Sequence, residues 1–394
     1  MTERLYYTDS YITEFTAEVL DIISDDGNIL LIFDKTAFFP GGGGQLCDKG
    51  TVNSVDITEV FERDGNIYHR IIADSIKISV GDTVCCSVDK AVRLERMRAH
   101  TGEHIVSGVA HNLFGVDNVG FHMDENCLMT VDFNKYLDNT QLNELERLAN
   151  LCVLKNYEVS CRSYSVEEAS ELQYRSKIDF DDFVRIVDIQ GVDCCACCAP
   201  HLKCTAEVGM IKILSSASHR GGVRITLICG MNVYNELALH YRQILNISSL
   251  LCSRHNEADS AVEKLVEANK QLKFRNEELR SEFLEYISES IASKDIIVEF
   301  FDRFSVDDLR NISNALAHKC GFCSFTLSGN DTVGYSYCIF SNKLNLRKLC
   351  KEFNLSLNGS GGGKGEMVQG KVNSTASEIR KFIDEMSVED YADA

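Results

Sequence analysis

The stretch Leu94-Glu95-Arg96-Met97-Arg98-Ala99-His100-Thr101-Gly102-Glu103-His104-Ile105 decides the fold, because it joins a helical apolar spacing to two histidines four residues apart. Side chains at positions i and i+4 project from the same face of a helix. We therefore expect both imidazoles to point in one direction from a helix that ends at Gly115. Such a pair is common on ordinary helices, so a metal site needs further ligands.

A second pair of metal-type ligands, Cys197 and His201, has the same spacing much later in the chain, and Pro200 stiffens the turn before the histidine. Three imidazoles and one thiolate suit Zn²⁺ and fill a tetrahedron at roughly 2.0 to 2.3 Å. The sequence therefore predicts one zinc ion per chain on four ligands: His100, His104, Cys197 and His201. Other thiols close in sequence compete with Cys197 as the ligand: Cys194, Cys195, Cys198 and Cys204. The spacing leaves open whether the zinc is structural or catalytic.

Composition bounds the class of protein. A chain of 394 residues is long enough for two or three domains, and 44% hydrophobic with 25% charged residues is ordinary for a globular protein. No apolar run approaches the ~20 residues that span a bilayer, and the first residues carry no signal-peptide pattern. The cytoplasm is therefore expected, with no membrane partner, and the odd count of 17 cysteines indicates reduced thiols.

The formal net charge of −19 argues against a protein coated in basic surface for nonspecific nucleic-acid binding. A local basic groove is still compatible with it. Arg96 and Arg98 lie just before the first ligand pair, and Arg224 follows the second. These charges would guide a polyanionic substrate to the site, although a solvated helix face explains each of them equally well.

The fold class predicted from the pattern is α+β, in four parts. Residues 1–88 alternate like strands between Asp and Gly turns and fit a small β-barrel, with strands expected at 29–33, 52–55, 67–72 and 84–88. Residues 89–233 mix helices and strands and form an α+β domain that carries both ligand pairs. Residues 234–292 are a helical connector, and residues 293–394 form a small α/β domain.

The connector lacks proline and glycine, and its apolar and asparagine residues follow the alternating three and four spacing of a heptad seam. The residues of this seam are Val262, Leu265, Asn269, Leu272, Asn276, Leu279, Phe283 and Tyr286. Paired asparagines of this kind fix the register of a dimeric coiled coil, so we expect a homodimer through the connector and the C-terminal domain. A helical hairpin that packs on itself is the alternative.

The C-terminal domain contains a glycine-rich segment at residues 358–365. The backbone amides of Gly361, Gly362 and Gly363 are candidates to meet phosphate or ribose. A flexible loop is the alternative interpretation of the same residues.

Several motifs in one order resemble the alanyl-tRNA editing proteins of the AlaX type and the editing half of alanyl-tRNA synthetase. The matching stretches are residues 36–50, 100–105, 120–123, 131–133, 197–201 and 361–369. The resemblance spans nearly the whole chain and is to the long form of the family. Two places depart from its pattern. Cys198, Ala199 and Pro200 fill the turn of the second zinc motif (residues 197–201), and Gly41 replaces an acidic residue in the glycine motif (residues 36–50).

The resemblance implies a zinc-dependent aminoacyl-tRNA hydrolase that acts in trans on tRNA(Ala) mischarged with serine and, secondarily, glycine. Nothing in the chain resembles an ATP-binding aminoacylation domain, so the protein is expected to edit but not to charge. The catalytic residues implied by the motifs are Thr36, Gln45 and His122. Gly42, Gly43 and Gly44 are expected to let backbone approach the terminal adenosine or the ester.

Each of these residues also has an ordinary structural explanation: Thr36 as a strand-end threonine, the glycines as a tight barrel turn, and His122 as a structural histidine. Thr36 is the candidate to contact the substrate hydroxyl. Two other functions stay open at this point. One is a catalytically weakened tRNA-binding or partner-binding homologue, and the other is a cysteine-rich zinc or redox protein.

Overall fold

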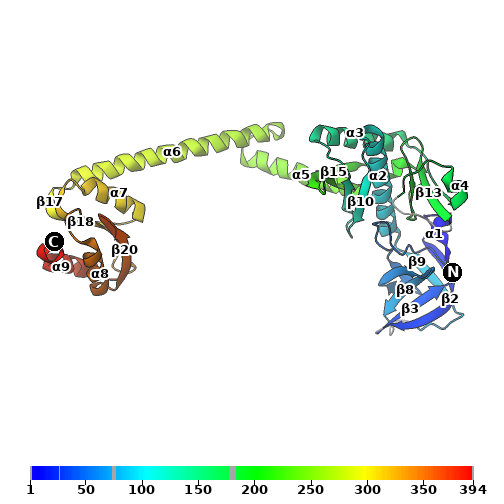
Figure 1. Cartoon of the computed structure of the whole chain (residues 1–394), viewed down its shortest axis with the longest axis horizontal. Helices are drawn as coiled ribbons and strands as arrows, with labels where there is room; N and C mark the ends of the chain where they lie inside the picture. The colour runs from blue at the N-terminus through cyan, green and yellow to red at the C-terminus, as the bar shows by residue number, and fades with distance from the viewer. Residues whose placement is uncertain (1, 26, 73–76, 177–182, 393–394) are drawn as a thin grey trace. The chain divides into compact units, whose positions relative to one another are not determined.

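The computed structural model describes residues 2–25, 27–72, 77–176 and 183–392. Two compact units make up the chain, Met1–Asn246 and Ile247–Ala394. Figure 1 shows the strands and helices of each unit in their chain order. Within the described ranges, no helix combines the length and the apolar character that a membrane crossing requires.

A nearly closed sheet of seven strands opens the first unit, in the order β6-β5-β9-β2-β3-β8-β7. Its strands are β2 (Glu14–Asp25), β3 (Asn28–Phe33), β5 (Gly50–Val52), β6 (Val55–Ile57), β7 (Glu59–Arg63), β8 (Asn66–Ile72) and β9 (Thr83–Val88). The two edges of the sheet meet where β6 leads into β7. There the Thr58 N–H donates to the carbonyl of Arg70 in β8 at 2.9 Å. The mixed α+β class and a barrel-like sheet are confirmed.

One strand expectation in this region was wrong. Residues 52–55 are a hairpin between β5 and β6, with left-handed backbone at Asn53 (φ 48°) and Ser54 (φ 67°). Two consecutive residues with positive φ form the tight turn that matches the twist of paired strands. Asparagine tolerates this conformation, so the two polar residues turn the chain instead of extending it.

Helix α2 (Lys90–Phe114) begins directly after the barrel and carries the first ligand pair. The Asp89 side chain accepts from the N–H groups of Ala91 and Val92, which caps the helix start. Gly115 ends the helix in the left-handed conformation (φ 58°), as predicted. Arg93 is buried against the barrel and pairs with Asp48, so the start of the helix is locked to the glycine motif.

Two sheets surround α2 in the second half of this unit (Figure 1). One has the order β10-β11-β16-β15 and the other β12-β13-β14. The strands are β10 (Asn118–Met123), β11 (Met129–Phe133), β12 (Val159–Ser165), β13 (Phe183–Ile189), β14 (Asp193–Ala196), β15 (Ile211–His219) and β16 (Gly222–Cys229). Helices α3 (Asn139–Lys155) and α4 (Val166–Ser170) pack beside them, α3 against α2 and α4 against β12.

Short elements complete this unit. They are α1 (Leu5–Thr8), the parallel pair β1 (Glu3–Arg4) and β4 (Lys35–Thr36), and the 3₁₀ turn η2 (Thr205–Val208). Two glycines of α2 let the helix approach both sheets closely. A Cβ at Gly102 would lie 2.4 Å from the Cys229 sulfur, and one at Gly108 would lie 2.4 Å from the Val192 carbonyl oxygen. The helix that carries the first ligand pair is therefore held firmly.

The predicted helical connector consists of two helices, α5 (Met231–Leu250) and α6 (Ala258–Ser290), with the 3₁₀ turn η3 (His255–Glu257) between them. Helix α5 ends at Leu250, and the backbone of Cys252 just after it is left-handed (φ 50°). Several seam residues of α6 are exposed, including Leu272 (70%) and Tyr286 (70%). Arg280 of α6 holds the following helix α7 (Val306–Leu316) through two 2.6 Å bonds to Asp308.

The C-terminal part is a five-stranded sheet in the order β17-β18-β19-β21-β20, packed against helices. Its strands are β17 (Lys294–Phe301), β18 (Cys320–Asn330), β19 (Gly334–Phe340), β20 (Gly359–Lys364) and β21 (Met367–Val372). The helices are α7, α8 (Leu346–Ser356) and α9 (Ala376–Glu385), followed by the 3₁₀ turn η4 (Val388–Tyr391). Its apolar core joins inward-facing residues of the sheet to α8 and α9.

The glycine-rich segment is strand β20, so the alternative of a flexible loop was wrong. It pairs antiparallel with β21 in a regular register that sets Gly361 opposite Gly370. A Cβ at Gly361 would lie 2.4 Å from the Tyr337 hydroxyl and 2.4 Å from the Gln369 carbonyl oxygen. Glycine is therefore required there by close packing, which sequence composition alone does not reveal.

Candidate functional site

Four side chains from α2 and from the loop after β14 converge in the first unit. Donor atoms of His100, His104, Cys197 and His201 all lie within 4.8 Å of one another. The Cys197 sulfur is 3.6 Å from Nε2 of His100 and 3.3 Å from Nε2 of His201. Nitrogen and sulfur ligands of a tetrahedral zinc ion lie about 3.6 Å apart, so the geometry of this donor set fits zinc.

Each imidazole of this cluster is oriented by a partner on its other nitrogen. The three contacts are His100 Nδ1 to Gln45 Oε1 (2.7 Å), His104 Nδ1 to Asp193 Oδ2 (2.9 Å) and His201 Nδ1 to Thr101 Oγ1 (3.1 Å). All three rings are almost completely buried. Because the outer nitrogens are engaged, the Nε2 atoms are the ones that face the centre of the cluster.

The pKa shifts at the cluster favour a thiolate at Cys197 and a neutral imidazole at His201, whereas His104 is shifted the other way. Burial alone would raise the pKa of the Cys197 thiol, but the neighbouring His100 and His201 hold that pKa well below its usual range. Burial lowers the pKa of His201 to about 3. Burial alone would lower the pKa of His104, but its hydrogen bond to Asp193 raises that pKa well above its usual range, so this imidazole has to release a proton when it binds a metal.

The neighbouring cysteines differ from Cys197 in the pKa of the thiol and in the residues that lie beside it. Burial raises the pKa of Cys195 and of Cys198 to about 11. Cys195 groups instead with the outer side of His104, beside Asp193. These observations favour Cys197 as the thiolate of the four-residue cluster.

The turn that departs from the family pattern is held by a buried arginine. Arg185 donates from Nη1 to the carbonyl oxygens of Cys197 (2.8 Å) and Ala199 (2.9 Å). In return, the Cys197 N–H donates to the Arg185 carbonyl at 2.9 Å. Ala199 is fully buried against the barrel core. The unusual residues therefore form a fixed turn that still presents Cys197 and His201 together.

The glycine motif places Gln45 beside the cluster. Gly42 and Gln45 exchange backbone hydrogen bonds of 2.9 and 3.0 Å, which closes a tight turn. Gly44 lies so close to β10 that a Cβ would meet the Phe121 carbonyl oxygen at 2.5 Å, whereas nothing lies within 4 Å of one at Gly42 or Gly43. Gln45 is 3% exposed, and among the described residues its Nε2 has no hydrogen-bond partner.

Thr36 and His122 lie differently from Gln45. Thr36 is completely buried, and its hydroxyl lies 2.9 Å from Nε2 of His69 and accepts from the Phe38 N–H at 3.1 Å. His122 is exposed on β10, next to Phe121, whose ring lies 5.0 Å from that of His100. Neighbouring residues of a strand face opposite sides, so the structure does not bring His122 to the ligands.

The three predicted arginines have distinct surroundings. Arg96 is 1% exposed and donates to the Cys47 carbonyl, so it supports the glycine motif from α2. Arg98 is partly exposed and reaches the Glu207 carbonyl at 3.1 Å. Arg224 makes bonds of 2.6 and 2.7 Å to Asp132, and this contact lowers the pKa of that carboxyl group.

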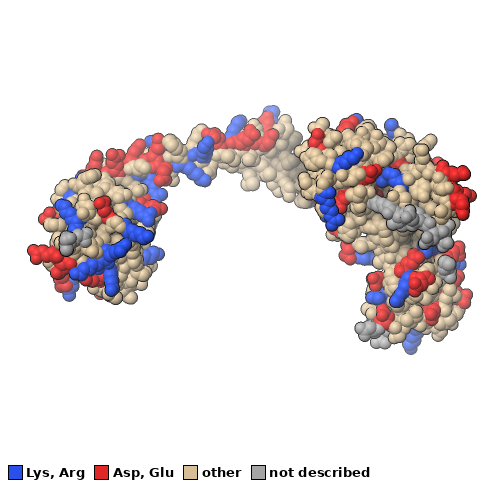
Figure 2. Space-filling view, viewed as in Figure 1, with Lys and Arg blue, Asp and Glu red and all other residues tan. Residues whose placement is uncertain are grey.

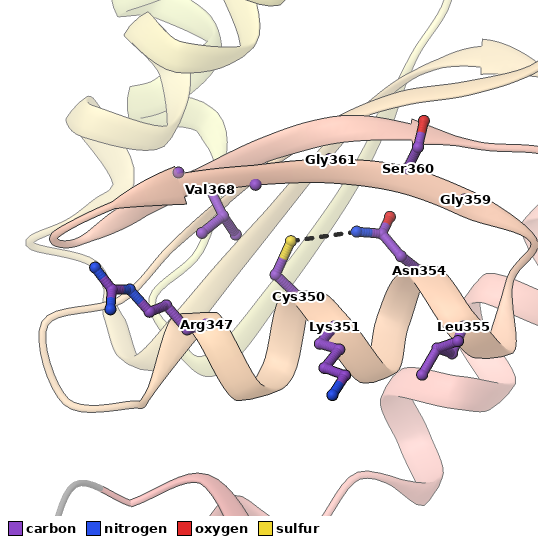
Figure 3. Close-up of a pocket in the computed structure, with 11 residues that line it drawn as sticks. Arg347, Cys350, Lys351, Asn354, Leu355, Gly359, Ser360, Gly361 and Val368 are labelled. Carbon is purple, nitrogen blue, oxygen red and sulfur yellow. Dashed lines mark hydrogen bonds between the residues drawn. The ribbon is translucent and has the colours of Figure 1, made fainter.

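A second candidate site lies in the other unit, between α8 and β20 (Figure 3). It is a cavity of about 530 Å³ lined by Arg347, Cys350, Lys351, Asn354, Leu355, Val368 and residues 359–363. Cys350 and Asn354 point from α8 toward the glycine strand, and a hydrogen bond of 3.3 Å joins them. Figure 2 shows Lys and Arg side chains gathered over this part of the unit. Gly361, Gly362 and Gly363 are exposed here.

Sequence reasoning missed several residues that shape the first site: Thr101, Phe121, Arg175, Arg185 and Asp193. Thr101 adjoins a ligand in sequence and Asp193 precedes Cys197 by four residues, so their proximity was visible. Their hydrogen-bond partners were not visible, because these depend on how α2 packs against β14.

Three family profiles match the chain. They are described as tRNA synthetases class II (A) over residues 3–92, the threonyl and alanyl tRNA synthetase second additional domain over residues 184–226, and the DHHA1 domain over residues 293–388. The alanyl-tRNA editing protein AlaX-L of Pyrococcus horikoshii is 26% identical over 96% of both chains. The resemblance to the long alanyl-tRNA editing proteins is confirmed.

Alanine–tRNA ligases share the same region. The ligase of Methanococcus maripaludis is 27% identical over 98% of this chain, and that of Methanococcus aeolicus is 29% identical over 94%. The chain spans only 43% and 41% of these two ligases, in contrast to its nearly full coverage of AlaX-L. A crystal structure of the C-Ala domain from Aquifex aeolicus alanyl-tRNA synthetase matches 24% of this chain and 93% of its own, at 20% identity and a TM-score of 0.22.

Proposed function

We propose that the protein is a trans-editing hydrolase that removes the amino acid from mischarged tRNA(Ala), chiefly seryl-tRNA(Ala) and secondarily glycyl-tRNA(Ala). The observation that carries the proposal is the cluster of His100, His104, Cys197 and His201 beside the unpartnered amide of Gln45. The relationship to AlaX-L supports an aminoacyl-tRNA substrate. The ligase relatives are described as charging enzymes, and only their editing and C-terminal regions are proposed to have counterparts here.

One zinc ion per chain is the proposed cofactor. When bound, it would act as a Lewis acid that holds or polarises the amino or hydroxyl group of the substrate. Four protein ligands fill a tetrahedron, so we assign positioning of the substrate as the main role of the cluster.

Gln45 is the proposed donor to the reacting ester. Its Oε1 is occupied by His100, which leaves the N–H bonds of Nε2 without a partner in the described structure. A buried amide donor aimed at a carbonyl stabilises the negative charge that develops on the oxygen during hydrolysis. An aminoacyl ester is already activated, so orientation and this stabilisation supply most of what the reaction needs.

The tight turn at residues 42–45 is the proposed docking point for the end of the tRNA. Gly42 and Gly43 are exposed and have open space around them, so ribose or ester can approach their backbone. Gly44 serves packing against β10 as well. Arg98 and Arg224 are partly exposed charges that would guide the polyanion toward this half of the unit.

Selectivity needs a group that recognises the serine hydroxyl, because alanine is smaller than serine and cannot be excluded by size. A site that binds the hydroxyl rejects the analogue that lacks it, since buried polar partners are then left unpaired. Thr36 is the proposed contact. Its proton and one lone pair are engaged by His69 and Phe38, so it has one lone pair left to accept a hydrogen bond.

The remaining parts are proposed to hold the tRNA and a second copy of the chain. The glycine strand, with its exposed backbone and the basic side chains Arg347 and Lys351, suits a phosphate and ribose backbone. The exposed seam residues of α6 suit a coiled-coil homodimer. The proposal also includes the division into barrel, zinc-binding domain, helical connector and C-terminal domain, with boundaries near residues 88, 233 and 292.

The experiment that tests the function compares deacylation of seryl-tRNA(Ala), glycyl-tRNA(Ala) and alanyl-tRNA(Ala) by zinc-loaded protein without ATP. We expect rapid loss of serine, slower loss of glycine and retention of alanine. Absence of seryl-tRNA(Ala) hydrolysis would reject the enzyme, and retained tRNA binding would then identify the weakened homologue. Metal content near one zinc per chain would exclude a protein whose extra cysteines bind further zinc.

A further inference from the structure

We propose that Asp193, held by Arg175, is a positioning residue that makes His104 the anchoring ligand of the metal cluster. The inference rests on the proposed zinc site and assigns a distinct task to one side of it. Asp193 begins β14, the strand that leads into Cys197, while His104 lies on α2. One carboxylate therefore joins the two segments that supply all four ligands.

Both oxygens of Asp193 have partners. Oδ2 lies 2.9 Å from Nδ1 of His104, and Oδ1 accepts from Nε (2.8 Å) and lies 2.7 Å from Nη2 of Arg175. The Asp193 side chain is only 2% exposed. A buried carboxylate with this pairing is held in one orientation, so it fixes both the ring plane of His104 and the nitrogen that carries the proton.

Arg175 is itself anchored to the same strand. Its N–H donates to the Cys194 carbonyl at 2.8 Å, and its carbonyl accepts from the Ala196 N–H at 2.9 Å. These two bonds hold the backbone of Arg175 beside β14, within reach of Asp193. Arginine, carboxylate and histidine form a continuous chain from the edge of the domain to the cluster.

The partners of the other two imidazoles are weaker. His100 is held by the neutral amide of Gln45, and His201 by the neutral hydroxyl of Thr101. Hydrogen bonds that involve an ionised group are roughly twice as strong as neutral ones. His104 is therefore the most firmly oriented of the three imidazoles, and His100 and His201 are held less firmly.

A second metal ion beside the first is the alternative for this group, because His104, Asp193 and Cys195 also lie within 4.8 Å of one another. That set shares His104 with the main cluster. Both oxygens of its carboxylate already have partners, Oδ2 in His104 and Oδ1 in Arg175. The geometry favours a supporting carboxylate over a second ligand set.

The test compares Co²⁺ and Zn²⁺ affinity in the full chain, by chelator competition and by the Co²⁺–thiolate absorption band, without any tRNA present. Asp193→Asn should weaken metal binding by about 10- to 100-fold, the usual loss when such a supporting contact is removed. Arg175→Gln should weaken it less, by about threefold to tenfold, because the carboxylate stays. Thr101→Val should have the smallest effect of the three.

Asp188→Asn is the matched control. Asp188 is exposed on β13 and lines the same cavity as Arg175 and Asp193, but it contacts none of the four ligands in the described structure. Its removal should leave affinity and spectrum unchanged. We also expect an altered Co²⁺ spectrum in Asp193→Asn at full metal loading, which a general loss of stability would not produce.

Unchanged affinity in Asp193→Asn, or a greater loss in Thr101→Val, would overturn the inference, as would two metal ions per wild-type chain. If Asp193→Asn does not fold, Arg175→Gln decides, because the Arg175 side chain is 20% exposed and its replacement disturbs the core less. Wild-type metal affinity in Arg175→Gln would then reject the role of the Asp193 and Arg175 pair. Failure of the proposed function is separable: a wild-type protein that binds zinc tightly but leaves seryl-tRNA(Ala) intact rejects the hydrolase and not this arrangement.

Discussion

The His/Cys cluster of the first unit and the cavity beside β20 in the second are built in opposite ways. In the cluster, His100, His104 and His201 are at most 3% exposed, and each has a named partner that sets its ring. In the cavity, the surface is exposed glycine backbone flanked by exposed cationic side chains. Hydrolysis requires fixed groups, whereas binding to a phosphate backbone tolerates mobile ones. We therefore expect damage in the first region to affect kcat and damage in the second to affect KM.

The largest expected effect comes from His104→Ala, which removes the anchoring ligand. Zinc and activity should be lost together, because the three remaining donors cannot hold the metal in the same geometry. Metal analysis and seryl-tRNA(Ala) deacylation check this. His111→Ala, on the same helix but exposed, is the control and should retain both. Full activity of the zinc-free variant would contradict the proposed chemistry.

Gln45→Glu separates the metal from the ester donor. The new side chain keeps an oxygen to accept from His100 but has no N–H for the reacting carbonyl. We expect zinc content to stay near one per chain while kcat falls by about 10²- to 10³-fold, the usual cost of removing one such donor. Single-turnover deacylation with saturating enzyme measures this. A variant with normal kcat would show that Gln45 only supports His100.

Replacing both Arg347 and Lys351 with alanine tests the second region. KM for seryl-tRNA(Ala) should rise about tenfold with kcat unchanged, because about 1.4 kcal/mol of binding is lost. The slope of log affinity against log salt should fall by about one for each phosphate contact removed. Arg310→Ala with Lys381→Ala removes the same charge elsewhere in this unit and should change neither value. A fall in kcat would contradict the division of tasks.

The smallest expected effect is that of Thr36→Val, which keeps the size of the side chain and removes its hydroxyl. Zinc should be retained, and the preference for serine over alanine should narrow about fivefold, the equivalent of one hydrogen bond of about 1 kcal/mol. The ratio of kcat/KM for the two aminoacyl-tRNAs measures it. An unchanged ratio with lowered thermal stability would assign Thr36 to the barrel core beside His69.

The sequence by itself determined the elements whose causes are local. The spacing of His100 and His104, the helix end at Gly115 and the two ligand pairs could all be read from short stretches, because helical geometry repeats within a few residues. The order of the motifs along the chain likewise indicated the editing family.

The tertiary structure alone decided which atoms those elements bring together. The glycine segment became a strand because β21 and Tyr337 lie against it, and residues 52–55 became a turn because β5 and β6 pair across them. Asp193 meets His104 only because α2 packs against β14. Hydrogen-bond partners between distant segments depend on packing, and short-range sequence patterns carry no record of it.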